Sequence, residues 1–242
     1  MNLGIRRKLR KWLLQGSNVY CPCCNKHAAT FLPFGKQVRF NALCPFCGSL
    51  ERHRLLWLFL FSREKKLINN GAKLLHVAPE RVFFKKFRRE KQIEYFPVDK
   101  FTPGHHYPRG TQEMDILNIS YQDNFFDSIL CSHVLEHVDN DMQAMKELYR
   151  VLKPAGWAIL QSPIDYSKPD TFEDSSITAP EEREKYFGQY DHVRFYGRDY
   201  PQRLMQAGFK VESIDFGNTF SNEEHKQFGL DRNDGIIYFC TK

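Results

Sequence analysis

The stretch FFDSILCSHVLEHVDNDMQAMKELYRVLKPAGW, residues 125–157, decides the fold of this chain. It opens with an apolar run of strand length, and a short segment rich in ionisable side chains follows. An amphipathic helical pattern comes next, and a turn at Pro154 and Gly156 leads into a second apolar run. Because strand and helix alternate in this order, the stretch predicts part of a parallel sheet with helices on its faces.

The same alternation continues on both sides of this stretch. Upstream, a helical pattern over 79–91 separates two apolar runs, and the second of them ends at Asp99. We therefore predict a doubly wound α/β sheet over residues 72–242, whose ligand site lies at the carboxyl ends of the strands. The predicted strands are 73–78, 93–98, 129–132, 157–161, 209–214 and 235–240.

These patterns together resemble a known family over residues 73–216. The chain is similar there to class I S-adenosylmethionine (SAM) dependent methyltransferases, in the broad group with a Leu-Glu-His signature after the fourth strand (type 11-like), which is residues 135–137 here. The resemblance implies a Rossmann-like sheet that is closed by an antiparallel edge hairpin. It also implies an enzyme that uses SAM as its methyl donor.

The resemblance assigns cofactor-binding roles by position. Asp99 would accept hydrogen bonds from the ribose hydroxyls, and Asp115 would read the adenine amino group between Met114 and Ile116. The loop that begins at Ser132 would line the methionine end of the pocket. The residues expected at the cofactor are His76, Ala78, Glu80, Asp99, Met114, Asp115, Ile116, Ser132 and His133.

One loop departs from the family pattern. The family usually has an acidic residue and a glycine-rich loop after the first strand, where this chain has HVAPE at 76–80. Glycines let the backbone approach a cofactor, and Ala78-Pro79 is stiffer, although proline is acceptable at the first position of a helix. Glu80 can meet the cofactor's ammonium group in place of the missing acid. Two hypotheses follow: SAM binding by a modified loop, which we favour, or a domain that has lost SAM binding.

Four of the seven cysteines form two closely spaced pairs about twenty residues apart. In a cytosolic chain such pairs favour a metal site over disulfides, and four sulfurs suit tetrahedral zinc in a structural role. Iron is the alternative metal, and Cys23 or His27 is an alternative ligand. Gly48 after the second pair suits a positive backbone φ. The predicted ligands are Cys21, Cys24, Cys44 and Cys47.

The cysteine spacing also sets the predicted domain organisation. We predict a basic amphipathic helix over 1–18, a zinc ribbon over 19–48 and a linking helix within 49–71. The methyltransferase domain would occupy 72–242. Within it, the polar segment 162–198 follows the fifth strand, above the carboxyl end of the sheet, where an insertion suits a lid or a substrate wall.

The candidate catalytic residues gather in this insertion. In an extended segment, His192, Arg194 and Tyr196 would share one face. His192 would act as a general base, Arg194 would hold a carboxylate or phosphate, and Tyr196 would orient the acceptor. His133 is the fourth catalytic candidate. A polar loop tied down by its own ion pairs explains the same pattern.

Charge and hydropathy narrow the classes of function. The net charge of +6 is modest, and the basic residues cluster at 6–11 and 85–91. The longest apolar run, 55–61, is too short to span a bilayer, and we expect a cytoplasmic protein without a signal peptide.

The leading hypothesis is methyl transfer from SAM to a small-molecule or glycan-type acceptor. The alternatives are a zinc-ribbon RNA methyltransferase, whose phosphate contacts the basic clusters would suit, and a catalytically inactive zinc-binding protein with this fold.

Overall fold

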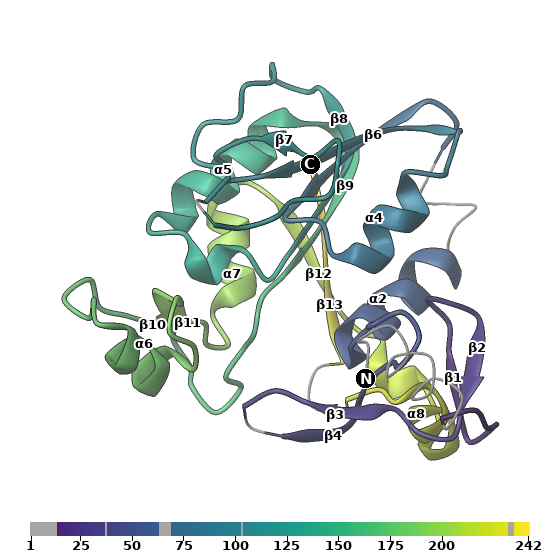
Figure 1. Cartoon of the computed structure of the whole chain (residues 1–242). Coiled ribbons are helices and arrows are strands. Elements are labelled where there is room, and N and C mark those ends of the chain that lie inside the picture. Colours follow the sequence, from purple (N-terminus) through teal and green to yellow (C-terminus); the bar gives the residue numbers. More distant parts are fainter. Residues whose placement is uncertain (1–13, 37, 63–68, 103, 232–234) are drawn as a thin grey trace. The chain divides into compact units, whose positions relative to one another are not determined.

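The computed structural model describes residues 14–36, 38–62, 69–102, 104–231 and 235–242. The chain divides into two compact units, which are described separately (Figure 1). The first unit comprises 1–67 and 215–236, and the second comprises 68–214 and 237–242. Most of the predicted helix over 1–18 lies outside the described residues.

A seven-stranded sheet forms the centre of the second unit, with the order β12-β13-β9-β8-β5-β6-β7. The five strands from β9 to β7 pair in parallel, and β13 pairs with β9 in the antiparallel sense. The predicted doubly wound sheet with an antiparallel edge is therefore confirmed. The strands are β5 (Ala72–Val77), β6 (Ile93–Asp99), β7 (Gln112–Glu113), β8 (Phe126–Ser132), β9 (Leu152–Gln161), β12 (Lys210–Asp215) and β13 (Ile236–Thr241).

Short helices connect these strands. One of them is α5 (Asp141–Val151), whose buried apolar face consists of Ala144, Met145, Leu148 and Val151. The side chain of Asn140 caps it by accepting a hydrogen bond from Gln143 N at 3.0 Å. The other helices of this unit are α4 (Arg81–Phe87), the 3₁₀ helix η1 (Leu135–His137), α6 (Pro180–Phe187) and α7 (Tyr200–Gln206).

The turn between α5 and β9 differs in detail from the prediction. The helix ends at Val151, three residues before Pro154, and the positive φ of 62° falls on Ala155. Gly156 is needed for a different reason. A Cβ on it would lie 2.8 Å from Lys153 O and 3.1 Å from Asp127 O, so only a residue without a side chain fits against this backbone.

The insertion at 162–198 is more regular than its sequence suggests. It contains α6 and a small antiparallel pair, β10 (Phe172–Glu173) and β11 (Arg194–Phe195). Its end is joined to η1 because Val193 N donates to Glu136 O at 2.9 Å. The insertion is thus fixed to the loop after β8 through its backbone.

The first unit consists of two small hairpins, a helix and a segment from the far end of the chain. The helix is α2 (Glu51–Ser62), and the distant segment, 215–236, carries η2 (Gly217–Thr219) and α8 (Asn222–Phe228). This differs from the predicted domain at 72–242, because the connection between β12 and β13 belongs with the ribbon. The hairpins pair β1 (Val19–Cys21) with β2 (Lys26–Ala28), and β3 (Leu32–Phe34) with β4 (Arg39–Leu43).

A buried arginine holds the distant segment in the first unit. Arg54 is fully buried on α2, and its guanidinium donates to Phe228 O at 2.5 Å and to Gly229 O at 2.6 Å. It also donates to Ala42 O and Ser49 O, both at 2.9 Å. These four carbonyls offset the cost of burying the charge.

Among the described residues, no helix is both long and apolar enough to cross a bilayer.

Candidate functional site

A pocket of about 420 Å³ lies at the carboxyl ends of β5, β6 and β8. This is the edge at which parallel α/β sheets bind ligands, and the volume suits a small molecule. Six of the nine predicted cofactor residues line it. They are Ala78, Asp99, Met114, Asp115, Ile116 and His133.

Two carboxylates in the pocket have different environments. Asp99 ends β6, and burial raises the pKa of its carboxyl group. Burial acts in the same direction on Asp115, but Lys100 Nζ lies 2.8 Å from its Oδ2 and lowers the pKa of Asp115 overall. Oδ1 of Asp115 accepts a hydrogen bond from Leu117 N at 2.9 Å. Asp115 is therefore oriented by the protein, and Asp99 presents a partly desolvated acceptor to the pocket.

Apolar side chains flank Asp115 on both sides. Met114 and Ile116 are both buried, and both line the pocket. Met114 N donates to Asp99 O at 2.9 Å, which fixes this segment beside the end of β6. The arrangement offers an apolar wall next to a hydrogen-bonding edge, which is what a flat heterocycle needs.

The loop that departed from the family pattern has an unusual backbone. Ala78 has a φ of +46°, in the left-handed region that favours glycine, and His133 at the end of β8 has a φ of +55°. Backbone hydrogen bonds of 2.8 Å hold both residues, from Ala78 N to Val98 O and from His133 N to Gln161 O. Since both residues line the pocket, the strain lies where a ligand would bind. Ala78 thus adopts the glycine-like turn without a glycine.

Three predicted cofactor residues do not line the pocket: His76, Glu80 and Ser132. His76 is buried, and its ring nitrogens lie 2.9 Å from Tyr95 Oη and 3.1 Å from Glu80 Oε2. The predicted role of Glu80 at the cofactor's ammonium group therefore competes with its pairing to His76. No local pattern indicates the contact with Tyr95, because Tyr95 reaches His76 from the neighbouring strand.

The predicted catalytic residues of the insertion all face the segment 135–141. Arg194 is buried and donates to Leu135 O and Asp139 O, both at 2.9 Å. Tyr196 is fully buried and donates to Asp141 Oδ2 at 2.8 Å. Their polar atoms are occupied by the protein, and neither residue lines the pocket. Arg194 and Tyr196 therefore hold the loop after β8. They do not have the acceptor-binding roles predicted for them.

His192 and His133 differ from that pair. His192 is buried, its ring centroid lies 4.7 Å from that of His137, and burial lowers its pKa. His133 lines the pocket, with Nδ1 3.4 Å from Oε1 of buried Glu136. Burial raises the pKa of Glu136, but the interaction with His133 outweighs it, and the pKa is lowered. Of the four catalytic candidates, His133 is the one that reaches the pocket.

Sequence reasoning missed several pocket residues in the segment after β6. Tyr107 Oη accepts a hydrogen bond from Thr102 N at 2.9 Å and donates to Lys100 O at 3.2 Å. The ring of Tyr107 stacks on Phe101 with centroids 4.4 Å apart. The segment has no periodic pattern, so only its position after Asp99 hinted at a ligand contact. The missed lining residues include Lys100, Thr102, His105, Tyr107, His137 and Asp191.

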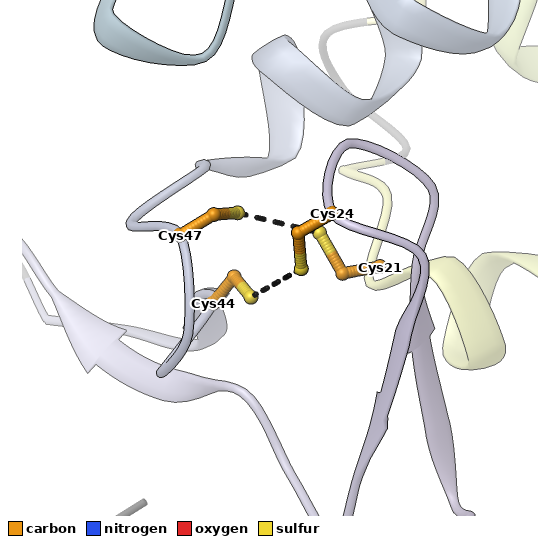
Figure 2. A group of neighbouring side chains, drawn as sticks. All are labelled: Cys21, Cys24, Cys44 and Cys47. Carbon is orange, nitrogen blue, oxygen red and sulfur yellow. Dashed lines mark hydrogen bonds between the residues drawn. The ribbon is translucent and has the colours of Figure 1, made fainter. Parts of the chain in front are cut away.

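The four predicted metal-binding cysteines meet in the first unit. Figure 2 shows their sulfurs pointing toward one another from two turns of the chain. All four lie within 4.8 Å of one another, with 3.6 Å between Cys21 and Cys47 and 3.8 Å between Cys24 and Cys44. A tetrahedron with zinc–sulfur bonds of about 2.3 Å has edges of about 3.8 Å. The donor set and its spacing therefore fit zinc.

The surroundings of the cysteine cluster agree with this fit. Ser49 Oγ lies 3.2 Å from Cys21 Sγ and 3.3 Å from Cys47 Sγ, as an outer hydrogen-bonding partner does around a metal. Cys23, one of the alternative ligands, points to His53 O at 3.7 Å and lies outside the cluster. The other alternative, His27, packs its exposed ring against Tyr20.

Comparisons with known proteins agree with the fold. Residues 70–160 match the family described as a methyltransferase domain. A SAM-dependent methyltransferase from Mesorhizobium loti has a similar structure, at 14% sequence identity over 78% of this chain and 98% of that one, with a TM-score of 0.52. A SAM-dependent methyltransferase from Archaeoglobus fulgidus is similar at 17% identity over 80% of this chain and 95% of that one, with a TM-score of 0.51.

A curated relative gives a shorter match. It is an uncharacterized protein of Methanocaldococcus jannaschii, 46% identical over 46 residues, which are 19% of this chain and 20% of the relative. The chain therefore matches about a fifth of that relative's length. Residues 70–160 therefore match the methyltransferase domain family, as predicted, and the chain has the Rossmann-like sheet of the solved methyltransferases.

Proposed function

We propose that this chain transfers a methyl group from SAM to a small-molecule or glycan-type acceptor. The observation that carries the proposal is the pocket at the strand ends, which combines aspartate carboxylates, an apolar wall and histidines. Its volume of about 420 Å³ supports a small ligand over an extended surface.

Different residues of the pocket suit different parts of SAM. Asp99 would hold the ribose, and Asp115 would bind the adenine amino group between Met114 and Ile116. The left-handed turn at Ala78 supports this reading, because it brings the backbone to the pocket as a glycine would. We infer that the HVAPE loop is a modified SAM loop and that the domain is active.

SAM supplies a methyl group that is already activated on a sulfonium. The protein then has to align the acceptor, exclude water and remove a proton where the acceptor carries one. His133 is placed for the last task, since it lines the pocket and its Nδ1 faces the carboxylate of Glu136 at 3.4 Å. A carboxylate at that distance orients the imidazole ring for proton transfer.

An RNA acceptor is the second candidate. A neighbouring open recess of about 710 Å³ shares Ala78 and Asp99 with the pocket, and Arg81 and Lys85 of α4 line it. Lys85 belongs to the basic cluster at 85–91, and both cations suit phosphate contacts. Binding to RNA with a steep dependence on salt concentration would favour this candidate, whereas weak binding that salt hardly changes would favour the small acceptor.

Calorimetry with SAM and the full zinc-loaded chain tests the first proposal. We expect binding, and Asp99→Ala should weaken it by about 2 kcal/mol, roughly 30-fold, because a hydrogen-bonded charged acceptor is lost. Glu94→Ala, which removes an exposed carboxylate from the other end of the same strand, should leave the affinity unchanged. Absence of heat with folded wild-type protein would refute SAM binding, and an unchanged affinity in Asp99→Ala would refute the ribose assignment.

The four cysteines complete the proposal. We propose that they hold one structural zinc ion, supported by the sulfur spacing and the closed set of four thiolates. The hydrophobic cluster around the site includes two of the ligands themselves, Cys21 and Cys44, packed with Val19, Ala28 and Phe31. A metal ion would add stability to so small a cluster.

A further inference from the structure

A second group of potential metal ligands lies beside the pocket. Glu136 and His137 come from η1, and His192 comes from the insertion before β11. One ligand atom from each of the three lies within 4.8 Å of the other two. His137 lines the pocket, while Glu136 and His192 are buried at 1% and 7% exposure. We call these three residues the His–Glu cluster.

The carboxylate of Glu136 is incompletely satisfied. Its Oε2 accepts a hydrogen bond from Ser162 Oγ at 3.0 Å. Its Oε1 is buried and accepts no hydrogen bond from any described residue, although His133 Nδ1 lies 3.4 Å away. A buried carboxylate oxygen without a hydrogen bond is costly, and a bound cation would remove that cost.

Both imidazoles are oriented in the way that metal ligands are. His192 Nδ1 lies 3.0 Å from Phe187 O, and His137 Nδ1 lies 3.3 Å from Asp191 O. A carbonyl oxygen can only accept, so each Nδ1 carries a proton, and in the corresponding neutral tautomer the lone pair lies on Nε2. Histidines that bind metals generally donate their other N–H to a carbonyl or carboxylate, as here.

The cluster is assembled without help from a ligand. Val193 N donates to Glu136 O at 2.9 Å, next to both segments that supply ligands. Arg194 adds its bonds to Leu135 O and Asp139 O on either side of the 136–137 pair. The two segments therefore have a fixed spacing, which is the preorganisation that a binding site requires. The structural role of buried Arg194 is therefore to hold these two segments together.

We propose that Glu136, His137 and His192 bind one divalent first-row transition metal ion. Two imidazoles and one carboxylate suit such ions, and three protein ligands leave coordination positions open. Since His137 lines the pocket, a metal ion held there would be accessible from the pocket, and a hydroxyl oxygen of the acceptor could complete its coordination. This assignment of the acceptor as a hydroxyl compound rests on the proposed methyl transfer, whereas the metal site itself does not.

Titration with Co²⁺ tests the site in the full chain after the four cysteines have been loaded with Zn²⁺. We expect one further Co²⁺ per chain, with the weak visible absorption of nitrogen and oxygen ligands and without the intense near-ultraviolet band of thiolate ligands. Glu136→Gln and His192→Gln should each weaken binding about a hundredfold or more, since they remove a direct ligand. The control His106→Gln changes an exposed histidine outside the cluster and should bind Co²⁺ as the wild type does.

SAM calorimetry on the same samples separates the possible failures. A variant that keeps its SAM affinity is folded, so its loss of Co²⁺ then reports on the ligand. Wild-type protein that binds SAM but no second Co²⁺, or variants with unchanged Co²⁺ affinity, would overturn the metal site and leave His133 and Glu136 as a simple ion pair. Co²⁺ binding without SAM binding would overturn the proposed function and leave the metal site standing.

Discussion

The four-cysteine cluster and the His–Glu cluster gather their donor atoms in different ways. In the first, short turns bring together Cys21 with Cys24 and Cys44 with Cys47, and the site lies in a unit of short hairpins. In the second, η1 and a distant insertion meet beside a seven-stranded sheet. The first unit has a small core that includes the ligands, whereas the second has a large core of its own. Metal should therefore control folding in one unit and only binding in the other.

Removal of a cysteine ligand should have the largest effect. Structural zinc contributes on the order of 10 kcal/mol to the folding of small metal domains, so Cys44→Ser should unfold the first unit. Hydrogen exchange should then become fast over residues 14–62 while the sheet of the second unit stays protected. Cys23→Ser is the matched control, because Cys23 lies outside the cluster. Protection that persists in Cys44→Ser would contradict the structural role.

The second unit should instead depend on its own ion pairs. Glu147 Oε1 accepts from Arg150 Nε at 2.7 Å, and Oε2 accepts from Ile119 N at 2.9 Å. The hydrogen bond with Arg150 lowers the pKa of Glu147 from its ordinary 4.5. Because the folded state has the lower pKa, the pair stabilises the fold above about pH 4.5 and its contribution is lost as the pH falls further.

Glu147→Gln measures that contribution. At pH 7 it should destabilise the second unit by about 1 kcal/mol, and at pH 3 the difference from wild type should be smaller. Urea denaturation followed by hydrogen exchange in α5 gives both values. Glu94→Gln, on an exposed carboxylate, should have little effect at either pH. An equal loss at both pH values would show that shape, and not charge, is what Glu147 provides.

The smallest expected change in stability concerns two residues with a left-handed backbone conformation, one in each unit. Ala78→Gly should relieve strain of about 1–2 kcal/mol, partly offset by the entropy of glycine in the unfolded chain, for a net gain of about 0.5 kcal/mol. Gly48→Ala, at a φ of +78° with open space around the new methyl group, should cost about 1 kcal/mol. Thermal denaturation compares the two. A loss of stability in Ala78→Gly would mean that the methyl group of Ala78 contributes packing that exceeds the strain.

Local patterns explain why most of the fold was predictable. The strands appear as apolar runs bounded by turn residues, and the bounds of β5 and β6 match the predicted ones to within one residue. The segment 215–236 was assigned to the wrong neighbour, because nothing local shows that Phe228 O and Gly229 O accept from Arg54. The pocket was predicted where family positions apply, at Asp99 and Met114–Ile116, and missed where the segment after Asp99 has no pattern.

The sequence by itself determined the order of strands and helices, the pairs of cysteines and the carboxylates at the strand ends, because each depends on spacing of a few residues. Only the tertiary structure decided that Arg194 and Tyr196 are buried supports, and that His137 and His192 meet at Glu136. Contacts between distant segments depend on how the sheet and the insertion pack. Side chains of the same type can therefore become ligands or anchors, according to which carbonyls and carboxylates packing places beside them.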